Sequence, residues 1–129
     1  MKLQPDHFDV QSILGYGTGW VGLGRNGVGD KIERSVIIGS RGELIDWHCV
    51  RFEDLKAEHF EQVAGYSPEL VLFGSGTHLR FPPPMFLRPL MAGRIGLETM
   101  DTLAACRTYN ILAGEGRHVL AALLIEPAN

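Results

Sequence analysis

The sequence ELVLFGSGTHLRFPP occupies residues 69–83 and is the best local guide to the fold. Within it, residues 70–73 (LVLF) are apolar without interruption, so they lack the alternation of a strand that has one wet face. Such continuous apolar strands are typical of parallel sheets, which are covered by helices on both faces. We therefore predict a buried strand that runs directly into a glycine-containing loop.

The remainder of the C-terminal half alternates in the same way between apolar strands and helices. Residues 95–97 and 118–125 are two further apolar segments. Pro89 lacks a backbone N–H and should break or kink any helix around it. Helical patterns occur in residues 52–64, 82–92 and 101–113. From residue 70 onward the pattern predicts a β-α-β-α-β unit with a mostly parallel sheet, in which Val71, Leu72, Val119 and Leu123 are buried.

The N-terminal half has a different pattern, in which short β-prone runs are separated by glycines. Residues 10–14 and 20–23 flank a glycine-rich stretch in which positive φ angles allow a tight hairpin turn. Residues 32–38 are rich in β-branched side chains, and a turn at residues 39–42 leads into residues 43–49. We predict antiparallel β hairpins that form a layer against the C-terminal unit.

Length and composition indicate one α/β domain covering residues 1–129, because 129 residues suffice for one sizeable core. Hydrophobic residues make up 45% of the chain and charged residues 21%, and the formal net charge is −3 with both signs scattered. No basic stripe suited to nucleic acid is present. The apolar run of residues 119–125 is too short to cross a bilayer, and residues 1–9 do not resemble a signal peptide. We expect a cytoplasmic protein.

Cysteine and histidine usage predicts neither a metal nor a cofactor. Cys49 and Cys106 are far apart in the sequence and fit no metal-ligand spacing, so reduced, buried thiols are expected. The histidines are dispersed, without the short spacings of paired ligands. The residues supply no recognisable catalytic set.

A candidate crevice follows from the predicted topology. Right-handed crossovers bring the loops after successive parallel strands to one edge of the sheet, where open α/β sheets bind ligands. The loop after residue 73 is rich in glycine, whose backbone N–H groups can contact an anion, and Arg80 adds a forked donor. The loop after residue 97 supplies carboxylates beside it. The candidate ligand-binding residues are Gly74, Ser75, Gly76, Thr77, His78, Arg80, Glu98 and Asp101.

The glycine loop also has a purely structural interpretation. It lacks the third glycine of the dinucleotide motif and the Gly-Lys-Ser/Thr ending of a P-loop, so its glycines could serve backbone shape alone. We favour that interpretation. Arg80 is then expected to lie near Glu98 and Asp101 and to be neutralised by a carboxylate, and His78 is the one histidine here that could act as an acid or base.

The acidic residues of the second loop leave alternatives open as well. Glu98 and Asp101 could be an acid–base pair or metal ligands. Alternatively, Asp101 or Thr99 caps the helix of residues 101–113, and Glu98 pairs with an arginine such as Arg94 or Arg107. Capping is the more common role for such residues. The polar residues 108–110 (TYN) could line a pocket or hydrogen bond to neighbouring loops.

Two stretches resemble a small domain family of unknown molecular function: residues 69–83 and residues 95–124 (IGLETMDTLAACRTYNILAGEGRHVLAALL). Eukaryotic members of that family include a mitochondrial complex I assembly factor and an adipogenesis-associated Mth-domain-containing protein. The resemblance implies a three-layer arrangement of β-sheets and helices. The family has no established catalytic residues that could be assigned to positions in this sequence.

Two functions from different classes remain. The first is a binding or assembly module, resembling a respiratory-complex assembly factor, that acts on a protein partner through its surface. The second is an anion binder or enzyme that uses the crevice of residues 74–80 and 98–101. We favour the first, because the resemblance points to assembly and no catalytic set is recognisable.

Overall fold

The fold is described by a computed structural model that covers residues 10–25 and 28–127. Its strands are β1 (Ser12–Gly17), β2 (Trp20–Arg25), β3 (Val28–Ile32), β4 (Val36–Gly39), β5 (Leu44–Asp46), β6 (Leu70–Gly74), β7 (Gly96–Met100) and β8 (Val119–Leu123). Its helices are the short 3₁₀ turns η1 (Phe52–Asp54) and η2 (Pro84–Leu87) and the α-helices α2 (Ala57–Ala64), α3 (Arg88–Ala92) and α4 (Thr102–Gly114).

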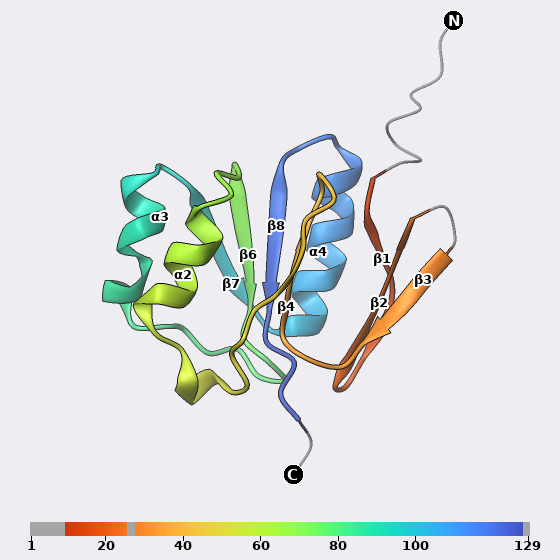
Figure 1. Cartoon of the computed structure of the whole chain (residues 1–129), viewed down its shortest axis with the longest axis horizontal. Helices are drawn as coiled ribbons and strands as arrows, with labels where there is room; N and C mark the ends of the chain where they lie inside the picture. Colours follow the sequence, from red (N-terminus) through yellow and green to blue (C-terminus); the bar gives the residue numbers. More distant parts are fainter. Residues whose placement is uncertain (1–9, 26–27, 128–129) are drawn as a thin grey trace, which may run out of the picture.

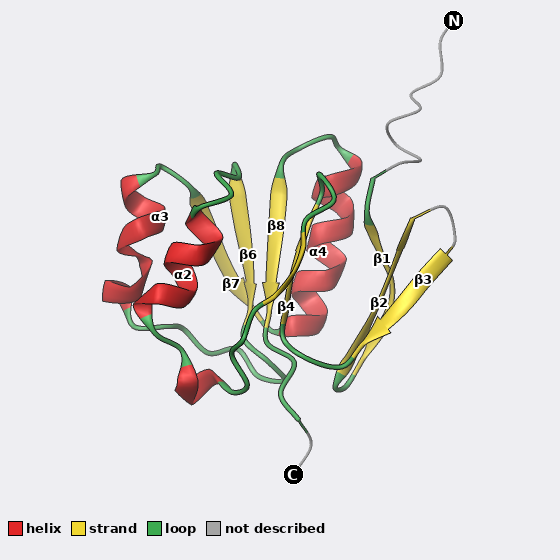
Figure 2. Ribbon diagram, viewed as in Figure 1, coloured by secondary structure: helices red, strands yellow, loops and turns green. Residues whose placement is uncertain are grey.

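The strands form two sheets. The first is antiparallel, in the order β1-β2-β3, and the second has the order β5-β4-β8-β6-β7. Within the second sheet β6 is parallel to both β7 and β8, while β4 is antiparallel to β8 and β5. Helices α2 and α3 cover one face of the larger sheet, and α4 lies between its other face and the three-stranded sheet (Figures 1 and 2). The predicted three-layer α/β class and the parallel arrangement of β6, β7 and β8 are confirmed.

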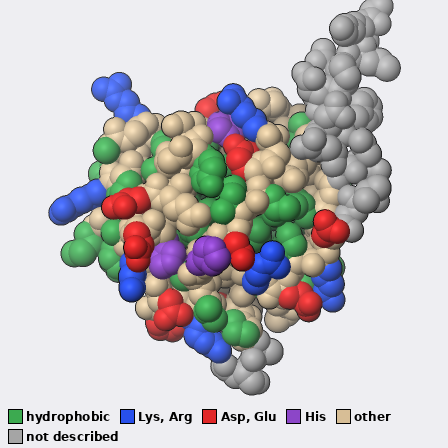
Figure 3. All heavy atoms as spheres, in the orientation of Figure 1, with side chains coloured by type: hydrophobic (Ala, Val, Ile, Leu, Met, Phe, Trp, Pro, Cys, Tyr) green, Lys and Arg blue, Asp and Glu red, His purple; other side chains and the backbone are tan. Residues whose placement is uncertain are grey.

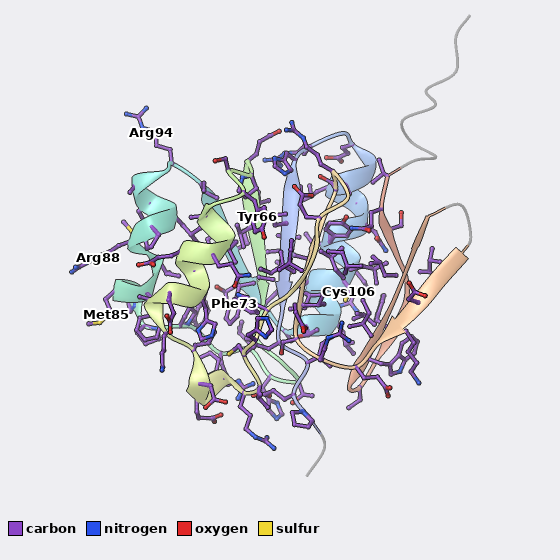
Figure 4. The ribbon with its side chains drawn as sticks, viewed as in Figure 1. Tyr66, Phe73, Met85, Arg88, Arg94 and Cys106 are labelled. Atoms are coloured by element: carbon purple, nitrogen blue, oxygen red, sulfur yellow. The ribbon has the colours of Figure 1, made fainter. Side chains whose placement is uncertain are left out.

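The uninterrupted apolar sequence of β6 is explained by two separate cores. Leu70 and Leu72 belong to the core shared with α4 and the three-stranded sheet, whereas Val71 and Phe73 belong to the core under α2 and α3. Figure 4 shows Phe73 near α2 and Cys106 on α4. Because both faces are covered, no position of this strand is left for a polar side chain, and all four residues are buried.

Several element boundaries differ from the sequence-based expectation. Residues 32–38 are not one strand, since β3 ends at Ile32 and β4, in the other sheet, begins at Val36. The exposed pair of residues 33–34 interrupts the apolar run, and the buried Ser35 hydroxyl accepts a hydrogen bond from the Ile125 N–H at 2.9 Å. Because β4 joins the larger sheet, that sheet is mixed rather than mostly parallel, and the N-terminal half is not one separate layer.

The expected helices are also divided. Residues 52–64 contain η1 and α2, separated at Leu55, which has an extended backbone. In residues 82–92 the structure shows a change of helix type rather than a break, since the 3₁₀ turn η2 ends at Leu87 and α3 begins directly at Arg88. Pro89 lies in the first turn of α3, where its missing N–H would have no helical partner.

The three-stranded sheet is attached to α4 through Tyr109 and Asn110, two of the polar residues 108–110. A register shift between Ile13 and Gly15 leaves a bulge in β1. There the side-chain amide of Asn110 accepts from the Ile13 N–H at 2.9 Å and donates to the Ile13 carbonyl at 2.8 Å. The Tyr109 hydroxyl donates to the Gln11 carbonyl at 2.6 Å. Of the two alternatives for this segment, the structure supports hydrogen bonding to a neighbouring element for both residues.

Replacing Asn110 should therefore loosen the attachment of the hairpin sheet. We expect Asn110→Ala to lower the free energy of unfolding by about 1–3 kcal/mol, because it leaves the Ile13 N–H and carbonyl without their partner. Urea denaturation measures this change. Ile111→Ala is the matched control, since Ile111 is 63% exposed on the same helix. Equal stabilities of the two variants would contradict the assignment.

Candidate functional site

The loop after β6 and the beginning of α4 lie side by side, as the crossover argument predicts. The Thr102 N–H donates to the Gly76 carbonyl at 2.8 Å, and the Gly76 N–H donates to the Thr102 hydroxyl at 2.8 Å. One residue earlier, the Ser75 N–H donates to the Met100 carbonyl at 2.9 Å. The carboxyl ends of β6 and β7 are thus joined directly.

Thr102 also connects these segments to β8. Its hydroxyl donates to the Leu124 carbonyl at 2.8 Å, while the Leu124 N–H donates to the Gly74 carbonyl at 2.9 Å. The Thr102 side chain is buried, and its hydroxyl is both a hydrogen-bond donor and a hydrogen-bond acceptor. It therefore holds three chain segments together and is not available as a nucleophile.

A cavity of about 310 Å³ opens at this edge of the sheet. Four segments line it: residues 17–20 of the β1–β2 turn, residues 76–77, residues 101–103 and residues 124–126. Its volume is at the lower end of the range for small-molecule sites, and its position is the usual one for an open α/β sheet. The attachment of the hairpin sheet to α4 is what brings the β1–β2 turn over this edge.

The cavity contains some of the predicted site residues and not others. Gly76, Thr77 and Asp101 line it, whereas Ser75 and Gly74 are buried beside it. The other three predicted residues, His78, Arg80 and Glu98, are not among its lining. Two contributors were missed, namely the β1–β2 turn and Glu126. Applying the same loop-after-strand rule to the segment of residues 118–125 would have found Glu126, but nothing local indicates where the β1–β2 turn lies.

Arg80 is paired, as expected, but with a different partner. Its Nη2 atom lies 2.6 Å from Glu126 Oε1, and its Nε and Nη2 atoms donate to the Ser75 carbonyl at 3.1 and 2.6 Å. The guanidinium lies over the Phe52 ring, 4.7 Å from its centroid. The second carboxylate oxygen of Glu126 accepts from the Phe52 N–H at 2.8 Å. Arg80 therefore holds the loop closed and is not left free for an anion.

The prediction that Glu98 lies in a loop is wrong, and Arg80 pairs with Glu126 instead. Glu98 lies within β7, opposite Leu72 of β6, and it is exposed. Within the described part of the chain, no ion pair joins it to an arginine or lysine. The strand continues past Leu97 because the parallel pairing with β6 extends through Met100. Asp101, in contrast, caps α4 by accepting from the Ala104 N–H at 2.9 Å, as one alternative proposed.

The glycine loop has the structural role that we favoured. Gly76 has a φ of +100°, and a Cβ atom there would lie 2.5 Å from Nη2 of Arg80 and 2.8 Å from Oε1 of Glu126. Only glycine fits this backbone and leaves room for the ion pair. The Ser75 hydroxyl donates to the His78 carbonyl at 2.6 Å and accepts from the Arg80 N–H at 2.9 Å, so it too is engaged.

The charges around the cavity are unfavourable for an anion. The charged residues in its lining are Asp101 and Glu126, and no lysine, arginine or histidine side chain is among the lining residues. Asp101 already occupies the N-terminus of α4, where a phosphate would otherwise be attracted by the free N–H groups. A neutral or positively charged group would meet less electrostatic opposition here. Within residues 10–25 and 28–127, no group of three or more histidine, cysteine, aspartate and glutamate residues could hold a metal ion.

Because Arg80 pairs with Glu126 inside the chain, we expect its replacement to lower the stability of the protein without abolishing any anion binding. We expect Arg80→Ala to lower the free energy of unfolding by about 1.5–3 kcal/mol, the usual contribution of charged hydrogen bonds in a half-buried site. Arg34→Ala is the control, because Arg34 and Asp46 form a pair whose side chains are 67% and 40% exposed. That change should cost no more than about 1 kcal/mol. A saturable phosphate titration of the wild type that disappears in a fully stable Arg80→Ala variant would contradict this assignment.

The two thiols should be inert in the folded protein. Burial raises the pKa of Cys106 to about 12 and that of Cys49 to about 11, from an ordinary value of 9.0. At pH 8 we expect iodoacetamide to modify neither cysteine in buffer and both in urea. Because the unfolded thiols ionise first, the free energy of unfolding should decrease as the pH rises above about 9. Rapid alkylation of the folded protein would contradict the assignment.

Fold and crevice together define a class: a three-layer α/β domain in which a hairpin turn covers the carboxyl edge of a mixed sheet. The chain belongs to the family described as protein of unknown function (DUF498/DUF598), whose sequence profile matches residues 13–124. The family resemblance noted in the sequence is thereby confirmed.

Relatives and solved structures agree with this membership. The chain is 33% identical over 86 residues to NADH dehydrogenase [ubiquinone] 1 alpha subcomplex assembly factor 3 of Bos taurus, a match that covers 65% of the chain and 47% of that protein. The chain thus spans about half the length of this curated relative.

Among solved structures, a Bordetella parapertussis protein matches with a TM-score of 0.82 and 34% identity, covering 92% of this chain and 98% of that one. A Bordetella pertussis protein described as a Mth938-like domain matches with a TM-score of 0.79 and 28% identity, over 100% of this chain and 95% of that one. Of the helices that the structure describes, none is both long and apolar enough to span a membrane.

Proposed function

We propose that this chain is a binding module that acts in assembly by contacting a protein partner through its surface. Kinship supports an assembly-like role at the level of the family, since the relative from Bos taurus is named an assembly factor. The finer role, in the assembly of a respiratory complex, rests on that kinship alone.

The internal use of the polar groups at the crevice is the second support. The Ser75 hydroxyl, the Thr102 hydroxyl and the Arg80 guanidinium all bond within the chain. General acid–base or nucleophilic catalysis needs a group that can reach a substrate, and these groups are already engaged. A protein contact makes no such demand, because a few side chains that become buried at the interface supply most of the binding energy.

The observation that carries the proposal is a concentration of exposed apolar side chains after β6. Leu79 and Phe81 are 55% and 68% exposed, on either side of the anchored Arg80. Further along the same segment, Met85 and Met91 are 63% and 71% exposed. Large apolar side chains that gather in one exposed segment are characteristic of interaction sites. Since Arg80 fixes the loop, Leu79 and Phe81 are presented in one conformation, which reduces the entropic cost of binding.

Copurification with a matched control tests this function. We expect a stoichiometric partner to copurify with the tagged wild type from its own cells, and to be lost from the Leu79→Ser/Phe81→Ser double variant. Ile111→Ser is the control, because Ile111 is equally apolar and 63% exposed but lies on α4. Both variants should keep the wild-type melting temperature. A partner retained by the double variant, or lost equally from both variants, would refute the assignment.

Small-molecule binding in the crevice is a second candidate, supported by the cavity of about 310 Å³ beside Trp20. The alternative of an anion ligand is weakened by the carboxylates of Asp101 and Glu126 in the lining. A neutral or cationic ligand fits this candidate better. A thermal-shift screen of small amines and neutral metabolites would detect it independently of any protein partner.

A further inference from the structure

Methionines and arginines alternate along η2, α3 and the turn that follows α3, in which Arg94 lies. Met85, Arg88, Met91 and Arg94 follow one another at intervals of three residues, and all four are exposed. Figure 4 shows Met85, Arg88 and Arg94 directed away from the sheet, at the edge of the molecule where α3 lies. In Figure 3 a hydrophobic and a basic side chain protrude next to each other at that edge. We refer to these four residues as the Met–Arg face.

The opposite side of the same segment accounts for its packing. Phe86 and Leu87 are partly buried against the core under α2, and Leu90 is 1% exposed within it. Because these three side chains hold the segment on the sheet, Met85 and Met91 are not needed for the fold. They expose flexible apolar side chains, a type common on surfaces that bind amphipathic helices.

The arginines of this face are not neutralised within the described chain. The ion pairs that the structure contains join Arg34, Arg80, Arg117 and His118 to carboxylates, and neither Arg88 nor Arg94 takes part in one. This contrasts with Arg80, whose charge is matched by Glu126 at 2.6 Å. The face therefore combines two positive charges that have no ion-pair partner among the described residues with two exposed apolar side chains, although the chain as a whole has a formal net charge of −3.

We propose that the Met–Arg face is a docking site for an acidic amphipathic segment of a protein partner. Apolar side chains of that segment would contact Met85 and Met91, and its carboxylates would pair with Arg88 and Arg94. The assignment rests on the proposed function, which it refines by giving the chemistry of the partner. Charge complementarity of this kind mainly sets specificity and association rate. An anionic lipid surface fits less well, because two arginines give little attraction and the net charge of −3 opposes adsorption.

Designed peptides test the chemistry directly. The probe is a fluorescent helical peptide with a stripe of leucines flanked by glutamates, and its counterpart has lysines in place of the glutamates. We expect fluorescence anisotropy to show saturable binding of the glutamate peptide to the wild-type chain. Arg88→Glu/Arg94→Glu should weaken this binding about tenfold or more and should acquire binding of the lysine peptide, since both contacts reverse from attraction to repulsion.

Two further variants separate the contribution of the methionines to peptide binding from the effect of overall charge. Met85→Ser/Met91→Ser should weaken binding of the glutamate peptide while the protein keeps its melting temperature, because neither methionine is part of the core. Arg107→Glu is the matched control, since Arg107 is exposed on α4, on the other face of the sheet. It should bind the glutamate peptide as the wild type does. Equal losses from Arg107→Glu and from Arg88→Glu alone, which change the net charge by the same amount, would reduce the effect to overall charge and overturn the proposal.

The remaining outcomes distinguish this inference from the proposed function. If the native partner still copurifies with Arg88→Glu/Arg94→Glu but is lost from Leu79→Ser/Phe81→Ser, the function stands and the Met–Arg face is not the contact. If no partner copurifies with any variant, the proposed function fails first. Failure of the wild type to bind the glutamate peptide overturns the inference. So does flotation with phosphatidylglycerol vesicles that depends on Arg88 and Arg94, because it would assign the face to a lipid surface.

Discussion

The buried hydroxyl of Thr102 connects the carboxyl ends of the parallel strands, and the surrounding structure depends on this connection. It accepts from Gly76 and donates to Leu124, each at 2.8 Å, so it connects the start of α4 to the segments that follow β6 and β8. With α4 fixed at this end, Asn110 two turns further on holds the bulge of β1. The β1–β2 turn then reaches over the sheet edge and encloses the cavity. Two polar side chains on one helix thus position the three-stranded sheet.

The same edge shows why a crevice in the usual position need not be catalytic. A nucleophile, an acid or an anion-binding arginine must have bonding capacity left for a substrate. Here the Ser75 hydroxyl and the Arg80 guanidinium close the loop onto the Ser75 and His78 carbonyls and Glu126. The rigidity gained in this way has a consequence for the surface, because the anchored Arg80 leaves Leu79 and Phe81 exposed. The same contacts therefore engage the polar groups of the loop and leave two apolar side chains exposed on its outer side.

Local sequence patterns were sufficient where a single segment decides the outcome. The run of residues 70–73 indicates a strand buried on both faces, since it is short, wholly apolar and followed at once by a glycine-containing loop. The cap of α4 by Asp101 follows from an acidic residue placed just before a helical pattern. The start of α3 beside Pro89 is also a local effect, because proline is favoured in the first turn of a helix. The patterns failed at residues 32–38, where an apolar run crosses from one sheet to the other.

By itself, then, the sequence determined roughly where β6, β7, β8 and α4 lie and that these three strands are parallel, because hydrophobic periodicity and crossover handedness act along the chain. Tertiary structure alone decided the partner of Arg80, since Glu126 lies 46 residues away in the sequence and Asp101 and Glu98 looked equally suitable. It also decided that the β1–β2 turn lines the cavity. Such contacts depend on how separate elements pack together, and packing is set by the complementarity of whole surfaces, which no local spacing of residues encodes.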